Sequence, residues 1–302
     1  IRFIPMTIIQ LEYLLAVANY GSFSAAAEKC FVTQPSLSMQ VKNLEEELGL
    51  VLLDRTRKPV VPTNAGEAVL KQARETVKSF DAIREIVANL KNDISGVLRL
   101  GVIPTIAPYL LHRLIPNFTK KYPKVDLHIR EMMNRDIIRA LRHDMLDAAI
   151  MTGGTIPDDI QEEELFNDRF YVYVSPDHPL SQRHNIRIEE IDPRRLLLLS
   201  EGNCLRDQVL ELCMLRKETI RQYTFDCNSI ETLMRIVDNT PNSLTVVPEM
   251  VSNFIDDPHR SQLKILAKGA VSRKISIAVR RTYAKQSLIT ALKESILSVT
   301  NK

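Results

Sequence analysis

Two cysteines in the second half of the chain, Cys204 and Cys213, lie in a setting that suits thiol redox chemistry. Cys204 follows an apolar run at 196–199 and a polar turn, so we expect it at or near the N-terminus of a helix, with Arg206 beside it. A helix N-terminus and a guanidinium both stabilise a thiolate relative to a thiol, and the thiolate is the form that attacks an oxidant. Oxidation at Cys204 is therefore the first candidate chemistry.

The spacing of the two cysteines opposes a disulfide within a continuous helix. Positions 204 and 213 would lie about 13 Å apart along the axis and on opposite faces, whereas a disulfide requires Cα atoms within about 7 Å. A bond between them would have to unwind that helix, and a covalent event that does not fit one conformation selects another. The alternative is that both cysteines are small buried hydrophobic residues, which is usual in a cytosolic protein.

The composition limits the kind of protein that positions these thiols. With 302 residues, 45% of them hydrophobic, the chain can bury a core in two or three domains. The net charge of +3 points to neither a nucleic-acid nor an acidic partner. Four cysteines and short apolar runs favour a cytoplasmic protein with reduced thiols and no membrane segment. The histidines are scattered singly along the chain, so we expect no metal site. The glycine-rich motifs typical of nucleotide-binding proteins are missing, so we expect no cofactor.

The larger part of the chain alternates predicted strands and helices. Residues 1–5 precede Met6 and are set aside as an upstream remnant. After a polar break at 91–96, we expect strands at 97–103, 126–132, 147–151, 170–174, 196–199, 224–227, 244–247 and 275–279, and helices at 106–122, 135–143 and 287–299. This alternation predicts a parallel α/β sheet.

A ligand of such a sheet binds beyond the carboxyl ends of the strands. The turns at 104–105, 152–153 and 200–203 should therefore line a cleft. Thr105 follows a strand and precedes a helix, so its hydroxyl could contact a ligand or cap that helix. Both interpretations stay open from the sequence.

Residues 7–66 predict a small helical module that contains two helices joined by a short turn. Ser22 and Ser24 flank Phe23 ahead of three alanines, so a serine caps the first helix. After the turn at 31–33, Thr33 is placed to cap the second helix, and Pro35 in its first turn costs little.

The second helix of this module is amphipathic. Its apolar face carries Leu37, Val41, Leu44 and Leu48, and its outward face carries Pro35, Ser36, Ser38, Met39, Lys42 and Asn43. A polar front of small residues suits a recognition helix in the major groove of DNA, and an ordinary surface helix is the alternative.

In this module, the positions of the charged residues are more informative than their net charge. Residues 6–66 hold five basic and six acidic side chains, a local charge of −1. Arg55, Arg57 and Lys58, however, lie together in a loop bounded by prolines. Such a loop fits a wing that contacts phosphates, with a solvated turn as the alternative.

A long helix is predicted over 64–90. Apolar positions recur at alternating steps of four and three, a heptad pattern; these seam residues are Val69, Ala73, Thr76, Phe80, Ile83, Val87 and Leu90. A solitary helix would expose this stripe to water, so the pattern favours pairing of two copies. Packing on the core of the same chain is the alternative.

These segments carry a family resemblance. The motifs are Leu-Glu-Tyr-Leu at 11–14, Gly-Ser-Phe-Ser-Ala-Ala-Ala at 21–27, Val-Thr-Gln-Pro-Ser-Leu-Ser at 32–38, Leu-Glu-Glu-Glu-Leu-Gly at 44–49, Leu-Asp-Arg at 53–55 and Thr-Asn-Ala-Gly at 63–66. Together they resemble the winged helix-turn-helix of LysR-type transcriptional regulators. Gly-Val-Ile-Pro-Thr at 101–105 and Leu-Asp-Ala-Ala-Ile at 146–150 are similar to the effector domain of that family, which is built like a periplasmic binding protein.

The resemblance implies an α plus α/β architecture. A winged helix-turn-helix would occupy 6–66, a dimerisation helix and hinge 67–96, and a two-lobed effector domain 97–302, with lobe I at 97–165 and 270–302 and lobe II at 166–269. It implies DNA contacts from Ser22, Ser24, Thr33, Gln34, Pro35, Ser36, Ser38, Lys42, Arg55, Arg57 and Lys58. It also implies dimers that associate into tetramers and act on RNA polymerase at a double-stranded operator.

Residues 202–213 resemble the redox segment of the peroxide-sensing members of this family. The resemblance implies that Cys204 attacks hydrogen peroxide, forms a sulfenic acid and is captured by Cys213 as a disulfide that activates oxidative-stress genes. The implied peroxide pocket consists of Thr105, Asn203, Arg206, Asp207 and Arg280. Cys30 and Cys227 have no partner at a meaningful spacing and are expected to be packing residues.

Two departures bear on this pocket. Asn203 stands where the family often has histidine, and Asn134 replaces a second cleft threonine. An amide cannot accept a proton at neutral pH, so peroxide sensitivity is expected to differ.

Two other functions remain as alternatives. One keeps the DNA-binding module, with a small metabolite in the cleft and structural cysteines. The other is a thiol peroxidase, which needs repeated reduction and leaves the helix-turn-helix without a role, so a non-enzymatic regulator is favoured.

Overall fold

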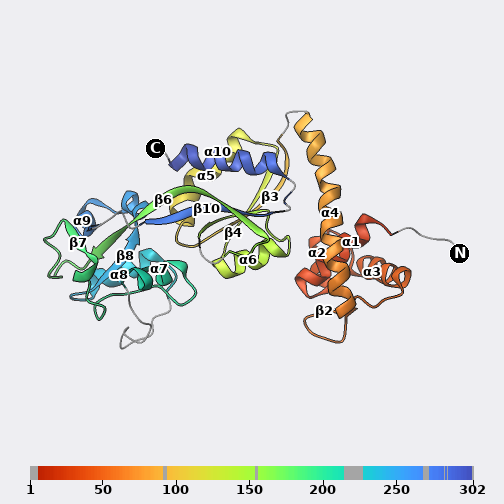
Figure 1. Ribbon diagram of the computed structural model, residues 1–302, viewed down its shortest axis with the longest axis horizontal. Coiled ribbons are helices and arrows are strands. Elements are labelled where there is room, and N and C mark those ends of the chain that lie inside the picture. Colours follow the sequence, from red (N-terminus) through yellow and green to blue (C-terminus); the bar gives the residue numbers. More distant parts are fainter. Residues whose placement is uncertain are drawn as a thin grey trace. The chain divides into compact units, whose positions relative to one another are not determined.

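The computed structural model describes residues 6–90, 94–153, 156–213, 227–267, 272–281, 283 and 285–300. The chain forms two compact units (Figure 1), the first comprising Ile1–Asp93, His143–Met145 and Tyr283–Ser287 and the second Ile94–Arg142, Leu146–Thr282 and Leu288–Lys302. The strand expected at 224–227 falls outside the described residues except for Cys227. Over the described residues, no helix is both long and apolar enough to cross a membrane.

The first unit contains the expected winged helix-turn-helix. Its elements are α1 (Ile8–Tyr20), α2 (Phe23–Lys29), α3 (Gln34–Leu48), β1 (Leu53–Asp54), β2 (Val61–Pro62) and α4 (Asn64–Leu90). Ser22 caps α2 by accepting from the backbone N–H of Ala25 at 3.4 Å. Thr33 occupies the N-cap of α3, but its side chain makes no capping hydrogen bond, so this part of the prediction is wrong. The strands β1 and β2 pair antiparallel and form the wing.

The core of this unit joins the helix-turn-helix to the start of α4. Leu37, Val41 and Leu44 of α3 are fully buried, whereas Leu48, expected on the same face, is 37% exposed because it lies at the C-terminal end of the helix. A Cβ added at Gly66 would lie 2.0 Å from the carbonyl oxygen of Leu52. Only glycine therefore permits this approach of α4 to the segment that leads into the wing.

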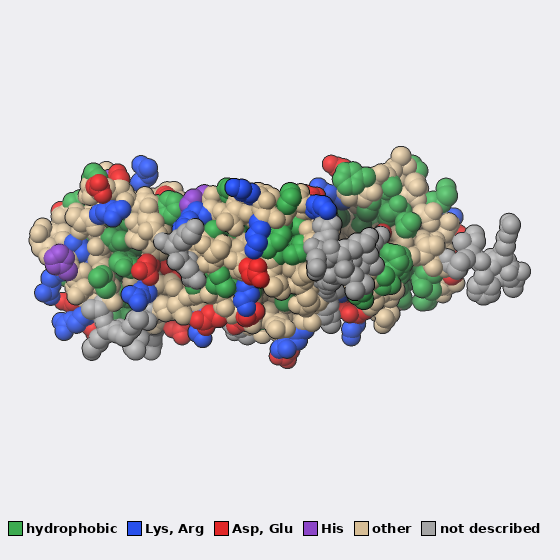
Figure 2. Space-filling model, turned by 90° about the horizontal axis from the view of Figure 1, so that it is seen from above, with side chains coloured by type: hydrophobic (Ala, Val, Ile, Leu, Met, Phe, Trp, Pro, Cys, Tyr) green, Lys and Arg blue, Asp and Glu red, His purple; other side chains and the backbone are tan. Residues whose placement is uncertain are grey.

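The seam residues of α4 divide into two groups. Ala73 is buried and Val69 packs against the same core, as the single-chain alternative expects. Phe80 and Ile83 are 38% and 60% exposed, and the side chains of Val87 and Leu90 lie outside the described residues. Figure 2 shows apolar side chains gathered on the surface of this unit. The N-terminal part of the seam thus serves the core of its own chain, and the next part stays exposed.

The second unit is built on an eight-stranded sheet of order β4-β3-β5-β10-β6-β9-β7, with β8 paired to β6. The strands are β3 (Gly96–Val102), β4 (Val125–Glu131), β5 (Ala148–Thr152), β6 (Ile160–Val174), β7 (Asn185–Arg187), β8 (Leu244–Pro248), β9 (Leu263–Ala267) and β10 (Ser272–Arg280). The helices are α5 (Ala107–Lys121), α6 (Asn134–Arg142), α7 (Cys204–Leu212), α8 (Ile230–Asn239), α9 (Asp257–Arg260) and α10 (Gln286–Thr300), with short 3₁₀ segments η1 (Ile188–Glu190) and η3 (Glu249–Phe254).

This sheet is mixed rather than parallel, which corrects the sequence-based prediction. β3 is parallel to β4 and β5, but β10 is antiparallel to β5 and β6, and β6 is antiparallel to β8 and β9. The strand β10 comes from the far end of the chain and lies between β5 and β6. Alternation of neighbouring segments cannot reveal such a long-range insertion.

The segment ahead of α7 is held to the sheet by few contacts. Residues 196–199, expected as a strand, make only a parallel bridge between Leu196 and Leu244. The backbone N–H of Leu197 donates to Leu244 at 2.8 Å, and that of Ser200 donates to Cys227 at 2.8 Å. Leu199 is buried in the cluster that also holds Leu205 of α7. This packing fixes where α7 begins.

Candidate functional site

Both cysteines of the candidate redox pair lie at the ends of α7. Cys204 is its first residue and Cys213 is its C-cap, so the predicted helix N-terminus at Cys204 is confirmed. The N-cap is Asn203, whose Oδ1 accepts from the backbone N–H of Leu205 at 3.0 Å. Gly202 precedes it with φ +84°, a left-handed conformation that favours glycine. Both cysteines are free and half-buried.

The continuous helix keeps the two thiols apart. Cys204 and Cys213 lie about 13 Å apart along the axis of an uninterrupted helix and point to opposite faces. Cys213 packs against the apolar cluster of this unit. Burial raises the pKa of the Cys213 thiol to about 11. In this conformation Cys213 is therefore a protonated thiol that cannot reach Cys204.

Arg206 and Asp207 occupy the first turn of α7 with different surroundings. The Nη1 of Arg206 donates to the carbonyl oxygen of Leu199 at 2.9 Å, which ties the helix to the segment before it. The side chain of Asp207 is exposed, and its backbone N–H donates to Asn203 at 3.3 Å. Arg206 thus lies beside Cys204 in the chain and also fixes the position of the helix.

Thr105 lies in a buried ionic network. Its Oγ1 accepts from Nη1 of Arg273 at 2.8 Å, and its carbonyl oxygen accepts from Nη2 at 3.1 Å. Arg273 also pairs with Asp168 at 2.9 Å, and the side chains of both charged residues are at most 1% exposed. The N-cap of α5 is Ile106, so the structure does not show Thr105 in the capping role.

The arginine that contacts Thr105 is Arg273, whereas Arg280, which the resemblance assigns to the peroxide pocket, lies elsewhere on the same strand. The two arginines lie seven residues apart on β10, which separates their Cα atoms by about 23 Å, and Arg280 pairs with Ile160 at the other end of the strand. Sequence reasoning missed Arg273. Strand alternation could have found it, because Arg273 shares a sheet face with the buried Ile275 and Ile277.

Several buried side-chain polar atoms of the second unit have no hydrogen-bond partner, some of them in α7 and the turn before it. They include Oδ1 of Asn134, Oγ1 of Thr152, Oγ of Ser200, Nδ2 of Asn203 and Oε1 of Gln208. Asn134 also donates from Nδ2 to the carbonyl oxygen of Thr152 at 3.3 Å. Thr152, Ser200 and Asn203 belong to the turns predicted to line the cleft. Each such atom costs about 1–3 kcal/mol when unpaired, so each of them is available to bind water or a small polar molecule.

A cavity of about 430 Å³ lies beside α7. Gln208 and Glu211 of α7 line it together with Arg273 and Gly153. Gln208 is one turn beyond Cys204 on the same helix face. The cavity therefore connects the helix that carries the cysteines with the arginine that holds Thr105.

Most of the predicted DNA-binding residues have exposed side chains. Thr33, Gln34, Pro35, Ser36 and Lys42 are exposed and Ser38 is half-buried, while Ser24 is exposed at the start of α2. The polar front of α3 thus has the orientation that the sequence predicts.

The basic residues of the wing and of α3 already have acidic neighbours. Arg55 pairs with Glu45 at 2.7 Å, and Arg57 pairs with Asp54 at 3.2 Å. The pKa of Asp54 is lowered, first by hydrogen bonds from Thr56 and then by Arg57. Lys42 pairs with Glu46 at 3.3 Å, and Lys58 is exposed. An arriving phosphate would compete with these surface pairs, which are individually weak.

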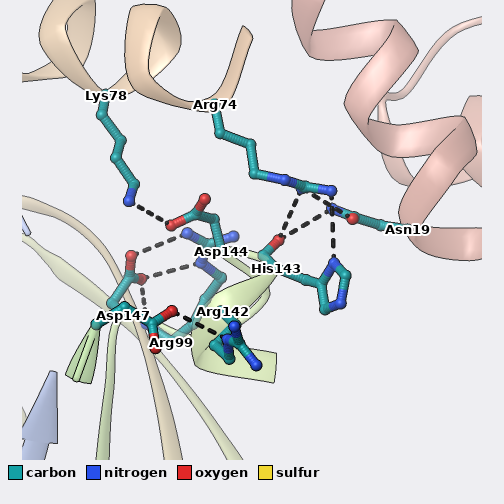
Figure 3. A network of polar contacts seen from close by, with 9 residues as sticks. Asn19, Arg74, Lys78, Arg99, Arg142, His143, Asp144 and Asp147 are labelled. Carbon is teal, nitrogen blue, oxygen red and sulfur yellow. Dashed lines mark hydrogen bonds and ion pairs between the residues drawn. The ribbon is translucent and has the colours of Figure 1, made fainter. Parts of the chain in front are cut away.

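The Asp147 of the motif at 146–150 has a structural role within the second unit. Its carboxylate accepts from Nε of Arg99 at 2.9 Å and from Nη2 at 2.8 Å (Figure 3). It also accepts from the backbone N–H of Arg99 at 2.8 Å, which anchors β3 beside β5. Within the first unit, Lys78 pairs with Asp144 at 3.0 Å.

Comparisons with known proteins agree over both units. Residues 8–67 match the family described as "Bacterial regulatory helix-turn-helix protein, lysR family", and residues 91–300 match the "LysR substrate binding domain". A "Hydrogen peroxide-inducible genes activator" of Dickeya chrysanthemi is 33% identical over 245 residues, which cover 81% of this chain and 80% of the relative.

Two solved structures extend the similarity to the fold. Full-length OxyR of Pseudomonas aeruginosa, solved as a variant, has a TM-score of 0.80 and 32% identity, with 97% of this chain and 95% of that chain covered. A mutant of Corynebacterium glutamicum OxyR, solved with hydrogen peroxide bound, has a TM-score of 0.64 and 26% identity, with 98% and 93% covered.

Proposed function

This chain belongs to the LysR family of bacterial helix-turn-helix regulators, and from that premise we propose that it is a DNA-binding regulator of the peroxide response whose sensor is Cys204. The names of its relatives support the peroxide signal. The observation that carries the proposal is local: Cys204 is the first residue of α7, directly after Asn203, whose buried Nδ2 lacks a partner.

The first chemical step is a two-electron oxidation of Cys204. Its thiolate attacks one oxygen of hydrogen peroxide, the O–O bond breaks, and the sulfur becomes a sulfenic acid. The departing hydroxide takes up a proton and leaves as water, so peroxide is reduced as the thiolate is oxidised. Asn203 can donate its unpaired N–H to peroxide, and Thr105, Arg206 and Asp207 complete the proposed pocket, with Arg273 in contact with Thr105.

The second step joins the two cysteines and requires α7 to open. The Cys213 thiol attacks the sulfenic sulfur, water leaves, and a Cys204–Cys213 disulfide forms. Because the intact helix separates the residues by about 13 Å, the disulfide can form only in a conformation in which α7 is unwound. Opening also exposes Cys213, whose raised pKa reflects its burial. Oxidation therefore selects a second conformation of the effector domain.

The other regions have matching roles in this proposal. Residues 6–66 bind the operator, 67–96 link and dimerise the subunits, and 97–302 carry the sensor. The exposed Phe80 and Ile83 support pairing of α4 with a second copy. Dimers then associate into tetramers, and the disulfide changes the contact between dimers that controls RNA polymerase.

A peptide map under non-reducing conditions tests the chemistry. After brief exposure to peroxide, the wild type should yield a Cys204–Cys213 linked peptide that Cys204→Ser lacks. Cys227→Ser is the matched control, since Cys227 is buried and donates to the carbonyl oxygen of Ser229. A wild-type map without the linkage contradicts the proposed disulfide.

The cavity beside α7 supports one other candidate. Its volume of about 430 Å³ would accept a small metabolite, with Gln208, Glu211 and Lys274 among the polar side chains that line it. DNA binding that ignores oxidant but responds to a molecule bound in this cavity would favour that function.

A further inference from the structure

Phe31 occupies an unusual position in the turn between α2 and α3. Its side chain is 95% exposed, and its backbone has φ +56°, in the left-handed region. A bulky residue is rare in that region, where glycine or asparagine is tolerated best. Neither burial nor backbone preference therefore explains a phenylalanine here, and such outliers cluster at functional sites.

The turn that carries Phe31 is well fixed. The backbone N–H of Phe31 donates to Glu28 at 3.3 Å, and that of Val32 donates to Ala27 at 3.0 Å. Thr33, two residues after Phe31, is the N-cap of α3. The aromatic side chain is thus held at the N-terminal end of the recognition helix.

Met39 is a second exposed apolar side chain on the same helix. It is 62% exposed and lies one turn beyond Pro35 and Ser36 on the outward face. Along the chain, the DNA contacts expected from Gln34, Pro35 and Ser36 are therefore flanked by Phe31 on one side and by Met39 on the other. A purely phosphate-binding surface would have no use for these two side chains.

We propose that Phe31 and Met39 recognise thymine methyl groups in the major groove, which adds an apolar component to the base recognition by α3. This inference rests on the proposed DNA-binding function. The C5-methyl of thymine is the apolar feature of the base edges in the major groove, and phenylalanine is a suitable partner for it. From Gln34 to Met39, α3 advances about 7.5 Å, or about two base-pair steps. The contact from Met39 therefore lies about two base-pair steps from the contacts expected at the start of α3.

A thymine-to-uracil scan tests this contact. The probe is a duplex that the full-length protein selects from random DNA, with each thymine replaced in turn by uracil, which lacks only the methyl group. Affinity is measured by fluorescence anisotropy at fixed salt. Loss of one buried methyl should weaken wild-type binding about fourfold at each recognised position. Phe31→Asn should be insensitive at one of these positions and Met39→Ala at another.

The variants separate recognition from folding. Asparagine tolerates a positive φ, so Phe31→Asn should keep or raise the melting temperature while it weakens DNA binding. Leu50→Ala is the matched control, because Leu50 is 46% exposed beyond the C-terminal end of α3. It should leave the uracil profile unchanged.

The outcomes distinguish this inference from the proposed function. Failure of the wild type to select any DNA would overturn the proposed function itself. Selection of DNA with a flat uracil profile, or with equal uracil losses in the wild type and both variants, would overturn only the methyl recognition. A uracil profile in Phe31→Asn that equals that of the wild type would overturn the assignment of Phe31 to a thymine methyl.

Discussion

The helices α3 and α7 differ in the way that their surroundings hold them. α3 has 15 residues, ends at Gly49 with φ +64°, and buries Leu37, Val41 and Leu44 completely. α7 has nine residues, ends at Cys213, and is flanked by buried polar atoms that lack partners. A helix this short is marginal without its tertiary contacts. DNA recognition needs one stable shape, whereas a disulfide switch needs a helix that can open.

The largest effect should come from the sensor helix, where Cys204→Ser should abolish the response to peroxide. A hydroxyl is not a useful nucleophile at neutral pH, so neither the sulfenic acid nor the disulfide can form. The measurement is transcription from a target promoter with and without peroxide. Cys30→Ser, which alters a thiol of the first unit, should respond like the wild type. A full response from Cys204→Ser would show that α7 is not the switch.

Asp168→Ala should strongly destabilise the second unit. It leaves Arg273 as an uncompensated charge with 0% side-chain exposure, and breaking such a pair costs about 3–5 kcal/mol. Thermal unfolding of the effector unit measures the loss. Asp257→Ala removes half of an exposed pair with Arg260 and is the control, for which no measurable loss is expected. An equally small loss in Asp168→Ala would contradict the structural importance of the Thr105 network.

Gly66→Ala tests the rigidity attributed to the helix-turn-helix. The new methyl would lie 2.0 Å from the backbone oxygen of Leu52, which cannot move independently of the core. We expect a loss of about 1–3 kcal/mol, as for overpacked cores, together with weaker DNA binding. Glu67→Ala, at an exposed neighbouring position, should change neither property. If Gly66→Ala unfolded with the same free energy as the wild type, α4 would be able to move away from Leu52 to accommodate the methyl. The helix-turn-helix would then be less rigid than the burial of α3 indicates.

The same two helices show how far the sequence alone leads. The apolar spacing of Leu37, Val41 and Leu44 was sufficient to orient α3, because a local period determines which face is buried. The polar turn before Cys204 was sufficient to predict the start of α7, because capping is also local. Leu48 was the exception on the apolar face, since the helix end leaves it without neighbours to cover it.

Contacts between residues that are far apart in the sequence were harder to predict. The position of β10 between β5 and β6 depends on residues more than 100 positions apart, and the predicted parallel sheet was therefore wrong. Arg273 was missed for the same reason, because its partners Thr105 and Asp168 are distant in the sequence. Phe80 and Ile83 of the seam are exposed in the single chain, and pairing with a second copy would cover them. Their role in dimerisation stays a prediction.

A pair of substitutions at Asn203 should produce the smallest and most diagnostic effects. Asn203→Ala removes the side-chain acceptor that caps α7 and should destabilise the helix by about 1 kcal/mol. Because the proposed disulfide requires α7 to open, its formation should accelerate by about fivefold at that energy. Asn203→Asp keeps a good N-cap and should leave closure unchanged, but it replaces the donor Nδ2 by an acceptor oxygen.

The two chemical steps separate the two roles of Asn203. In a Cys213→Ser background, which stops the reaction at the sulfenic acid, both Asn203→Ala and Asn203→Asp should slow the first step, because neither side chain can donate to peroxide. Closure of the disulfide is followed in the presence of Cys213, by the loss of the Cys213 thiol once a saturating peroxide pulse has oxidised Cys204 to the sulfenic acid. If both variants changed the rate of disulfide formation equally, capping would not control the opening of α7, and the contrast with the more deeply packed α3 would need another cause.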